Sequence, residues 1–328
     1  MPKFLLFIVT IVLLSIQLMG QSPILEVVNT AKRQTSTLQK ANIFKAKSSV
    51  SSVARLQSNL RDGLVLEVDN KALSLLNTEK PNTLEFEIER GKNEKPLTLE
   101  LVKHNVFTND FNIKTDKTDN YNISNLGTHY RGIVKGENES VVALSIFDDE
   151  ILSVINTPLE GDIILGKTRH SEAEYILYKE KDVLETPNIA CGTKDIPLTP
   201  SQIEGMKNIS QTANRVSNCV NVYFELDYTL FQEKGTVEAS IEFIAGVYNV
   251  VATIYQNEEI TTKISEVFVW TQEDPYDFPS SAQALDAFRA NRRSYNGDIA
   301  HLVSRGNPRS GGIAWVNALC SSLSLIHI

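Results

Sequence analysis

Apolar residues alternate with acidic ones in the first half of the chain. The stretches Leu64–Val68 (LVLEV) and Leu84–Glu89 (LEFEIE) show this alternation. A period of two places the apolar side chains on one face of a strand and the charged ones on the other. The pattern continues at Leu97–Val102, and Gly91-Lys92-Asn93 supplies a turn between the last two runs.

Further short strands with close turns follow. Their residues are Tyr130–Val134, Ser140–Phe147, Ile151–Ile155 and Asp162–Leu165, with turn sequences at 136–138, 148–149 and 160–161. Many short strands joined by tight turns are typical of an antiparallel sheet. We therefore predict a β-rich domain at residues 61–180, preceded by a polar and partly helical leader at residues 21–60.

A second domain is predicted from Cys219 onward. Apolar residues alternate with Asn221, Tyr223 and Glu225, which predicts a strand. From Val237 to Tyr255 apolar residues recur every three or four positions, which predicts a long helix capped by Thr236.

The elements after this helix complete an alternating pattern. We predict a strand at Ile264–Trp270, a helix capped by Ser280 or Ser281 and stopped at Asn296-Gly297, and strands at Ile299–Val303 and Gly311–Val316. Strands that alternate with helices are typical of an α/β domain. The whole chain is therefore expected to be α+β with two domains.

Residues 181–217 form the predicted linker between these domains. Pro187, Pro197 and Pro200 lie among polar residues with little apolar content. Such a segment is exposed and open to proteolysis. One cysteine, Cys191, lies inside it, in the sequence Ala-Cys-Gly-Thr.

The first twenty residues have the layout of a secretory signal peptide. Lys3 is followed by an apolar run from Phe4 to Leu18, and Gly20 lies near a plausible cleavage point. The alternative is a membrane anchor, but 15 helical residues reach roughly 22 Å, short of a hydrocarbon core of about 30 Å. We therefore expect a secreted, extracellular protein without a membrane anchor.

Composition and charge exclude one class of partner. The net charge of the 328 residues is −8, and the basic residues form no stripe, so a nucleic-acid partner is not expected. Only three cysteines occur, Cys191, Cys219 and Cys320. An odd number in an exported chain leaves at least one thiol without a partner in the same chain, and the sequence does not assign the pairs.

Several C-terminal stretches together resemble one peptidase family. They are Val220–Tyr228 (VNVYFELDY), Val251–Tyr255, Val269-Trp270-Thr271 with Asp274-Pro275, Leu285–Phe288, and Gly312–Val316 leading to Cys320. Their order and spacing resemble the catalytic domain of reprolysin-like (adamalysin) zinc peptidases, which are metzincins, and look most similar to the secreted bacterial branch. The resemblance implies a β-rich prodomain followed by part of an α/β metzincin catalytic domain at residues 218–320.

The resemblance also implies a chemistry, with protein or peptide substrates. The complete enzyme would hydrolyse internal peptide bonds with zinc-activated water, after an activating protease has cut the 181–217 linker. The family's metal-binding motif, H-E-x-x-H-x-x-G-x-x-H, is absent from the sequence. The five histidines are His104, His129, His170, His301 and His327, and none has a histidine four residues later or a glutamate directly after it.

The end of the chain also departs from the family pattern. Residues 321–328 (SSLSLIHI) lack the expected loop, so we interpret them as a truncated or non-native tail. The metal-binding helix is accordingly expected beyond residue 328. The fragment itself is expected to bind no catalytic zinc and to be inactive.

Two candidate sites remain within the chain. Cys191 resembles a cysteine switch, in which a thiolate holds the zinc of a zymogen; the alternative is a structural disulfide, for example with Cys219. Gly312, Ile313, Ala314 and Trp315 resemble the edge strand that pairs with extended substrate beside the zinc, and the alternative is an ordinary core strand.

Two other functions remain open. A secreted β-rich adhesion or binding protein would show no catalysis, and its downstream sequence would lack a histidine helix. A free-standing prodomain-type inhibitor would act in trans through Cys191.

Overall fold

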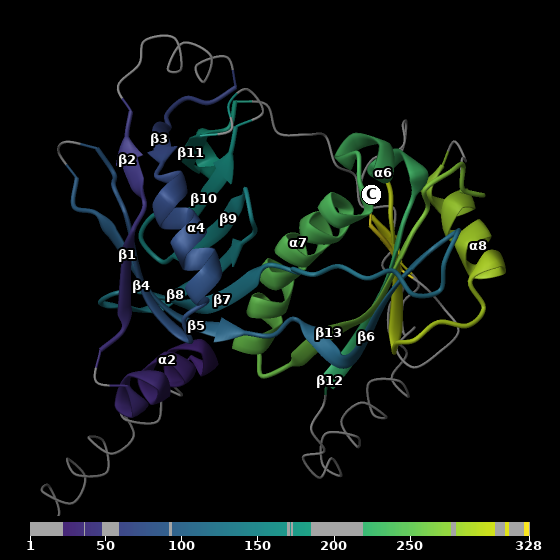
Figure 1. Cartoon of the computed structure of the whole chain (residues 1–328), viewed down its shortest axis with the longest axis horizontal. Helices are drawn as coiled ribbons and strands as arrows, with labels where there is room; N and C mark the ends of the chain where they lie inside the picture. Colours follow the sequence, from purple (N-terminus) through teal and green to yellow (C-terminus); the bar gives the residue numbers. More distant parts are fainter. Residues whose placement is uncertain are drawn as a thin grey trace, which may run out of the picture.

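The computed structural model describes residues 22–47, 59–184, 219–305, 312–314 and 325–327, apart from residues 36, 92–93, 169–170, 172 and 277–279. Two sheets organise these residues, and one long helix lies between them (Figure 1). The predicted signal peptide and most of the predicted linker lie outside the described residues.

The N-terminal sheet has ten strands. Their order across the sheet is β1 (Gln39–Asn42), β4 (Thr83–Ile88), β5 (Leu97–His104), β7 (Thr128–Val134), β8 (Glu137–Ile146), β9 (Ile151–Thr157), β10 (Gly161–Lys167), β11 (Glu174–Lys179), β3 (Leu64–Val68) and β2 (Phe44–Ala46). Neighbouring strands are antiparallel, except that β1 runs parallel to β4. The predicted antiparallel β-rich region is confirmed.

The two edges of this sheet are consecutive in sequence. Only Ile43 separates β1 at one edge from β2 at the other, so the sheet is nearly closed into a barrel. A helix that the sequence pattern did not predict, α4 (Asn70–Glu79), lies within the curve of the strands (Figure 1). Leu73 and Leu76 of α4 join the barrel core, and the Asp69 side chain caps the helix.

Two short elements flank the barrel. The leader contains helix α2 (Pro23–Gln34), which confirms its partly helical character. Ile24, Leu25 and Val28 of α2 bury their side chains against Ile133 on the outside of the barrel. A 3-10 turn, η2 (Glu180–Asp182), follows the last barrel strand.

The C-terminal sheet has six strands. Their order is β15 (Ile313–Ala314), β16 (Leu325–His327), β14 (Ile299–Val303), β12 (Cys219–Leu226), β13 (Thr261–Val269) and β6 (Phe107–Thr115). All neighbours are parallel except β15 and β16. One outer strand, β6, comes from within the N-terminal half of the chain, and no pattern had indicated a strand there.

Helices cover both faces of the C-terminal sheet. On one face α7 (Val237–Asn257) forms a core with β12 and β13, and the short helix α6 (Tyr228–Lys234) adds Leu230 to it. On the other face α8 (Ser281–Asn291) packs through Leu285 and Phe288. This α/β layout agrees with the prediction, including the caps at Thr236 and Ser280.

The predicted stop of α8 at Asn296-Gly297 was wrong. The helix ends at Asn291 because the backbone of Arg292 leaves the helical region, and its side chain points to Glu225. The central strand β12 is also more buried than a half-exposed strand. Tyr223 and Glu225 are both fully buried, as expected for a parallel strand covered on both faces.

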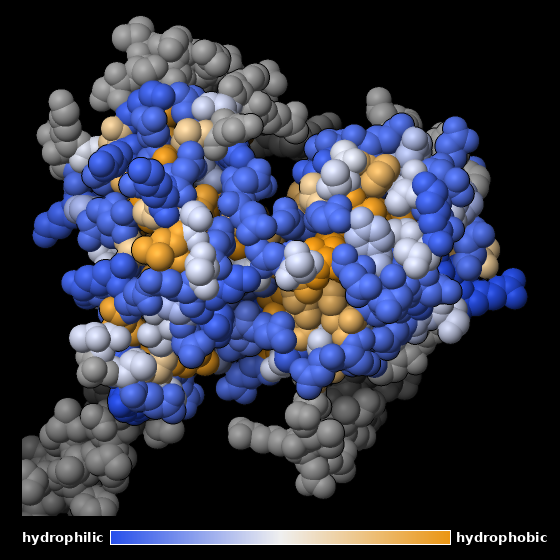
Figure 2. Space-filling model, in the orientation of Figure 1, coloured by the Kyte–Doolittle hydropathy of each residue, from blue (hydrophilic) through white to orange (hydrophobic). Residues whose placement is uncertain are grey.

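Helix α7 contacts both sheets. With 21 residues it is long and apolar enough to cross a membrane, yet it packs as a core helix between β13 and the barrel strand β8. A stripe on its outer side remains exposed, with Val247, Val251, Ile254 and Tyr255 between 37% and 58% accessible. Figure 2 shows apolar surface in the middle of this view, where Figure 1 places α7.

Candidate functional site

The predicted substrate strand lies at the border of the C-terminal sheet. Strand β15 pairs antiparallel with β16, through Ile313 with Ile326 and Ala314 with Leu325, and in the described part of the chain it is the outermost strand. Gly312, Ile313 and Ala314 are half-buried, and Trp315 lies outside the described residues. The use of this strand for substrate remains a prediction.

The cysteine sites are only partly visible. Cys191 and Cys320 lie outside the described residues. Cys219, at the start of β12, has a free thiol whose Sγ lies 3.7 Å from Oδ1 of Asn221. Because Cys191 lies outside the described residues, both the cysteine switch and the disulfide with Cys219 stay predictions.

The histidines that the structure describes lie in two places: His104 and His129 are opposite each other on neighbouring barrel strands, whereas His301 and His327 lie in the C-terminal sheet. His104 and His129 lie in the barrel strands β5 and β7, whereas His301 lies in β14 with its ring 5.2 Å from that of Phe224. Burial lowers the pKa of His104 to about 3 and that of His129 to about 4. Within the described ranges no group of three or more His, Cys, Asp or Glu side chains could hold a metal ion.

A buried carboxylate organises the C-terminal sheet. Oε1 of Glu225 accepts hydrogen bonds from Nε1 of Trp270 (2.8 Å) and from the hydroxyl of Tyr276 (2.7 Å). Oε2 accepts from the hydroxyl of Tyr223 (2.6 Å) and from Nε of Arg292 (2.6 Å). Every one of these partners is a donor, so the carboxylate fixes strand β12 to the loop after β13 and to the end of α8.

The Glu225 carboxylate raises the pKa values of the groups that surround it. Burial, the charge of Glu225 and the hydrogen bond to Glu225 raise the pKa of Tyr276. The pKa of Tyr223 is raised for the same reasons. Burial opposes the charge of Arg292, but the hydrogen bond and the attraction to Glu225 raise its pKa, so it stays cationic. The cluster therefore joins the Arg292–Glu225 ion pair to two tyrosine hydroxyls whose pKa values are raised.

Sequence reasoning missed this cluster. Glu225 appeared only as a polar position of an alternating strand, and its partners are distant along the chain. The signal that could have found it is an acidic residue in the middle of the strand predicted to be central, because a parallel central strand is covered on both faces.

A hollow of about 460 Å³ opens beside the Glu225 cluster. It lies at the carboxyl ends of β6 and β13, and its lining includes Asp116, Trp270, Tyr276 and Arg292. The guanidinium carbon of Arg292 lies 4.5 Å from the ring centre of Phe268, in a cation–π contact. The lining combines charged and hydroxyl side chains with aromatic faces, so it offers groups that bind a polar ligand.

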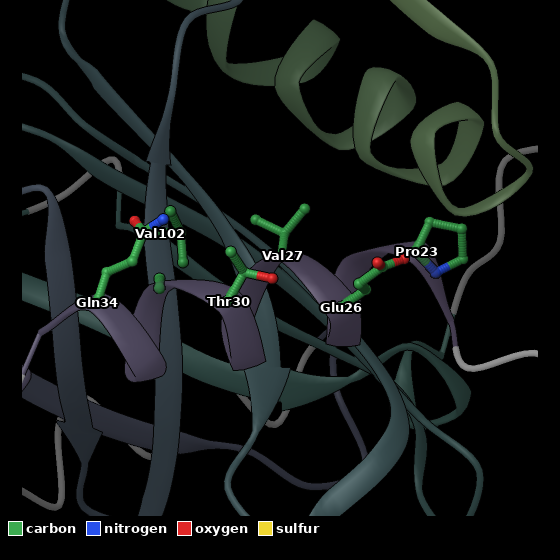
Figure 3. A pocket seen from close by; sticks show the side chains of 7 residues that line it. Pro23, Glu26, Val27, Thr30, Gln34 and Val102 are labelled. Atoms are coloured by element: carbon green, nitrogen blue, oxygen red, sulfur yellow. The ribbon is translucent and has the colours of Figure 1, made fainter.

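A second hollow, of about 370 Å³, runs along α2 outside the barrel (Figure 3). Val27 points from α2 toward α7, and Val102 of β5 lies at the other side. Glu26 is the one ionisable residue among its lining residues. A single acid without a basic or nucleophilic neighbour does not assemble a catalytic site.

The comparison with family models decides the identity of the C-terminal region. Residues 216–328 match the Reprolysin_5 model, described as metallo-peptidase family M12. This region is a reprolysin-like M12 metallopeptidase domain. The match begins just before β12 and includes α6, α7, α8 and the Glu225 cluster, so these elements are parts of the M12 region.

Two further comparisons complete the picture. A search of curated proteins gave no match. Among solved structures, the chain is similar to metalloproteinase-II from Bacteroides fragilis, with 11% sequence identity and a TM-score of 0.41 over 75% of this chain and 74% of that one.

The M12 family implies zinc, but the described residues do not fit a zinc site. They contain no metal-binding group, and the 328-residue sequence contains no H-E-x-x-H motif. The M12 region therefore supplies the sheet and its covering helices from its own residues, and we derive no chemical step through a metal held by them.

Proposed function

We propose that this chain is the front part of a secreted zinc metalloendopeptidase precursor. The match of residues 216–328 to the M12 family carries the proposal. The sheet covered on both faces by α7 and α8 is consistent with it, because a hydrolase scaffold of this kind presents its substrate strand at one border. The apolar run at Phe4–Leu18 supports secretion.

In this proposal the N-terminal β-rich region is the prodomain. The barrel packs against α7 of the M12 region, and the proline-rich linker at residues 181–217, which includes Cys191, joins the two. An activating protease would cut within this linker. The Cys191 thiolate would occupy the open zinc position of the zymogen and so keep the complete enzyme silent.

The substrate would be an extended peptide beside β15. Backbone N–H and C=O groups of residues 312–315 would pair with it, which gives affinity with little dependence on sequence. The zinc ligands and the glutamate that activates water would come from residues outside the 328, since no histidine in this sequence has a second histidine four residues later.

The deciding experiment compares this chain with its complete natural reading frame. Both proteins are purified, their zinc is measured by mass spectrometry, and hydrolysis of a quenched fluorescent protein substrate is followed before and after limited proteolysis. We expect one zinc per molecule and chelator-sensitive activity from the complete protein only. If the complete protein lacks both zinc and activity, before as well as after limited proteolysis, the proposal is refuted and a binding module is favoured.

The Cys191 role has its own test in the complete protein. Cys191→Ser should raise the peptidase activity of the uncut precursor, because a hydroxyl is a far poorer zinc ligand than a thiolate. Cys219→Ser, at a free thiol that does not lie in the linker, is the matched control and should leave the uncut precursor silent. Equal latency of the Cys191→Ser precursor and the wild type would exclude the switch.

A further inference from the structure

One strand belongs to both halves of the molecule. By sequence β6 lies between the barrel strands β5 and β7, yet it leaves the barrel and pairs in parallel with β13 of the M12 sheet. The pairing extends from Phe107 opposite Ile264 to Thr115 opposite Val269. The chain enters β6 from the barrel strand β5 and leaves it to the barrel strand β7. The N-terminal region therefore contributes β6 as an edge strand of the M12 sheet.

The contact is part of a core and not only of a sheet edge. Val106, Phe107 and Ile113 are at most 6% exposed and share one apolar cluster with α7 and β13. Ile264 and Val267 of β13 are fully buried in the same cluster. Without β6, part of this apolar surface and one row of β13 backbone groups would face water.

Polar contacts fix the register of the strand. The amide of Ile264 donates to the carbonyl of Val106 at 2.8 Å. Lys114 Nζ forms an ion pair with the nearly buried carboxylate of Glu266 at 2.8 Å. Asp116, directly after β6, accepts hydrogen bonds from both the amide and the hydroxyl of Thr271 at 2.7 Å.

The barrel also contacts the M12 region at a second place, on α7. Gly246 has no side chain there, and a Cβ on it would lie 3.3 Å from Leu152 Cδ2 and 3.4 Å from Phe147 Cε2. One turn further along the helix, the fully buried Asn249 donates to the carbonyl oxygens of Tyr130 and Leu144 at 3.3 and 3.2 Å. A small residue and a satisfied buried amide are features of a fitted interface.

The Asn249 amide oxygen also has a partner. It accepts from Nε of Arg131 at 3.2 Å, and Nη1 of the same guanidinium donates to Gln256 Oε1 at 2.6 Å. Arg131 is 3% exposed in the folded chain, and these two hydrogen bonds to α7 would be lost if the barrel and the helix separated.

We infer that two parts of the M12 region, the edge of β13 and the face of α7 that contains Gly246 and Asn249, form a docking surface for residues 22–184. These residues remain bound as a separate subunit when the chain is cut between residues 185 and 218. None of the contacts above involves the residues of that segment, so a cut there removes none of them. The inference goes beyond the proposed function and holds whether or not the cut occurs in nature. It means that proteolysis yields a two-chain complex and not a free M12 region.

The test uses the full chain with a specific protease site inserted within residues 185–218. After complete cleavage the two pieces should elute together from a sizing column at about 1 µM, which places their dissociation constant below that concentration. Hydrogen exchange should show the β13 amides as protected after the cut as before it. Separation of the wild-type pieces, or loss of protection along β13 on cutting, would overturn the inference.

Two leucine substitutions in the same helix test the α7 surface. Gly246→Leu places a side chain against Leu152 and Phe147 and should raise the dissociation constant of the cut protein at least about tenfold. Val251→Leu, on the exposed side of α7, is the control and should leave it unchanged. If Gly246→Leu does not fold, Asn249→Ala replaces it with the same expectation. Equal dissociation constants for the variant and the control would contradict the assigned surface.

Discussion

The Glu225 cluster gives a prediction with a calculable size. In Glu225→Gln one carboxylate oxygen becomes an NH₂ group, which cannot accept a hydrogen bond. Each oxygen of Glu225 serves one tyrosine hydroxyl and one N–H group. The tyrosine can rotate its hydroxyl to accept from the new NH₂, but the N–H of Trp270 or of Arg292 can only donate.

At least one partly buried N–H donor therefore loses its acceptor, which costs roughly 1–3 kcal/mol. The loss of negative charge beside Arg292 adds to this, although that side chain is 24% exposed and water screens part of the effect. We expect the substitution to lower the free energy of unfolding of the M12 region by about 3 kcal/mol.

Urea unfolding followed by tryptophan fluorescence measures this loss. The two tryptophans, Trp270 and Trp315, both lie in the M12 region, so the signal reports on that region. Glu233→Gln is the matched control, because Glu233 pairs with Arg305 at the surface and its loss should cost no more than about 1 kcal/mol. Midpoints that shift equally for the two variants would refute the assigned role of Glu225.

Two further predictions concern the barrel. His129 is 3% exposed, and burial, aided by the charge of Arg131 and opposed by a hydrogen bond to Leu126, lowers its pKa to about 4. The unfolded chain takes up this proton below about pH 6.5 while the folded one does not, so His129 should not affect stability above pH 7 and should lower it by about 2 kcal/mol at pH 5. His104, whose pKa burial lowers to about 3, should add a similar loss. His129→Asn should remove the His129 share, about half, of that dependence in urea titrations at the two pH values, and an unchanged slope would count against the buried neutral imidazole. Gly132→Ala should destabilise the protein by about 3 kcal/mol or prevent folding, because its Cβ would lie 1.9 Å from the carbonyl oxygen of Glu100. Gly166→Ala, with open space around it, is the control in thermal melts, and a Gly132→Ala melt like that of the control would contradict the close approach.

The local sequence pattern was sufficient to predict elements whose secondary structure depends on residues close together in the chain. The stripe from Val237 to Tyr255, with Thr236 before it, predicted α7 and its cap, because both depend on residues within a few positions of one another. Alternation predicted the antiparallel strands for the same reason. The family match of the C-terminal region agrees with the resemblance of its stretches to reprolysin-like peptidases.

Other features were beyond local pattern. Helix α4 has only Leu73 and Leu76 as fully buried positions, so its stripe is too weak to stand out from the flanking strands. Strand β6 contains Asn, Asp and Lys, and it becomes a strand because β13 offers an unpaired edge and an apolar core beside it. No window of neighbouring residues contains that information.

The sequence by itself determined the periodicities, the helix caps, the secretory leader pattern and the absence of paired histidines, since each is a property of residues close together in the chain. Tertiary structure alone decided that β6 crosses into the M12 sheet, that α7 lies between two sheets, and that Glu225 is buried among Tyr223, Trp270, Tyr276 and Arg292. These outcomes depend on which distant surfaces cover one another, and burial fixes that choice only when the whole chain has folded.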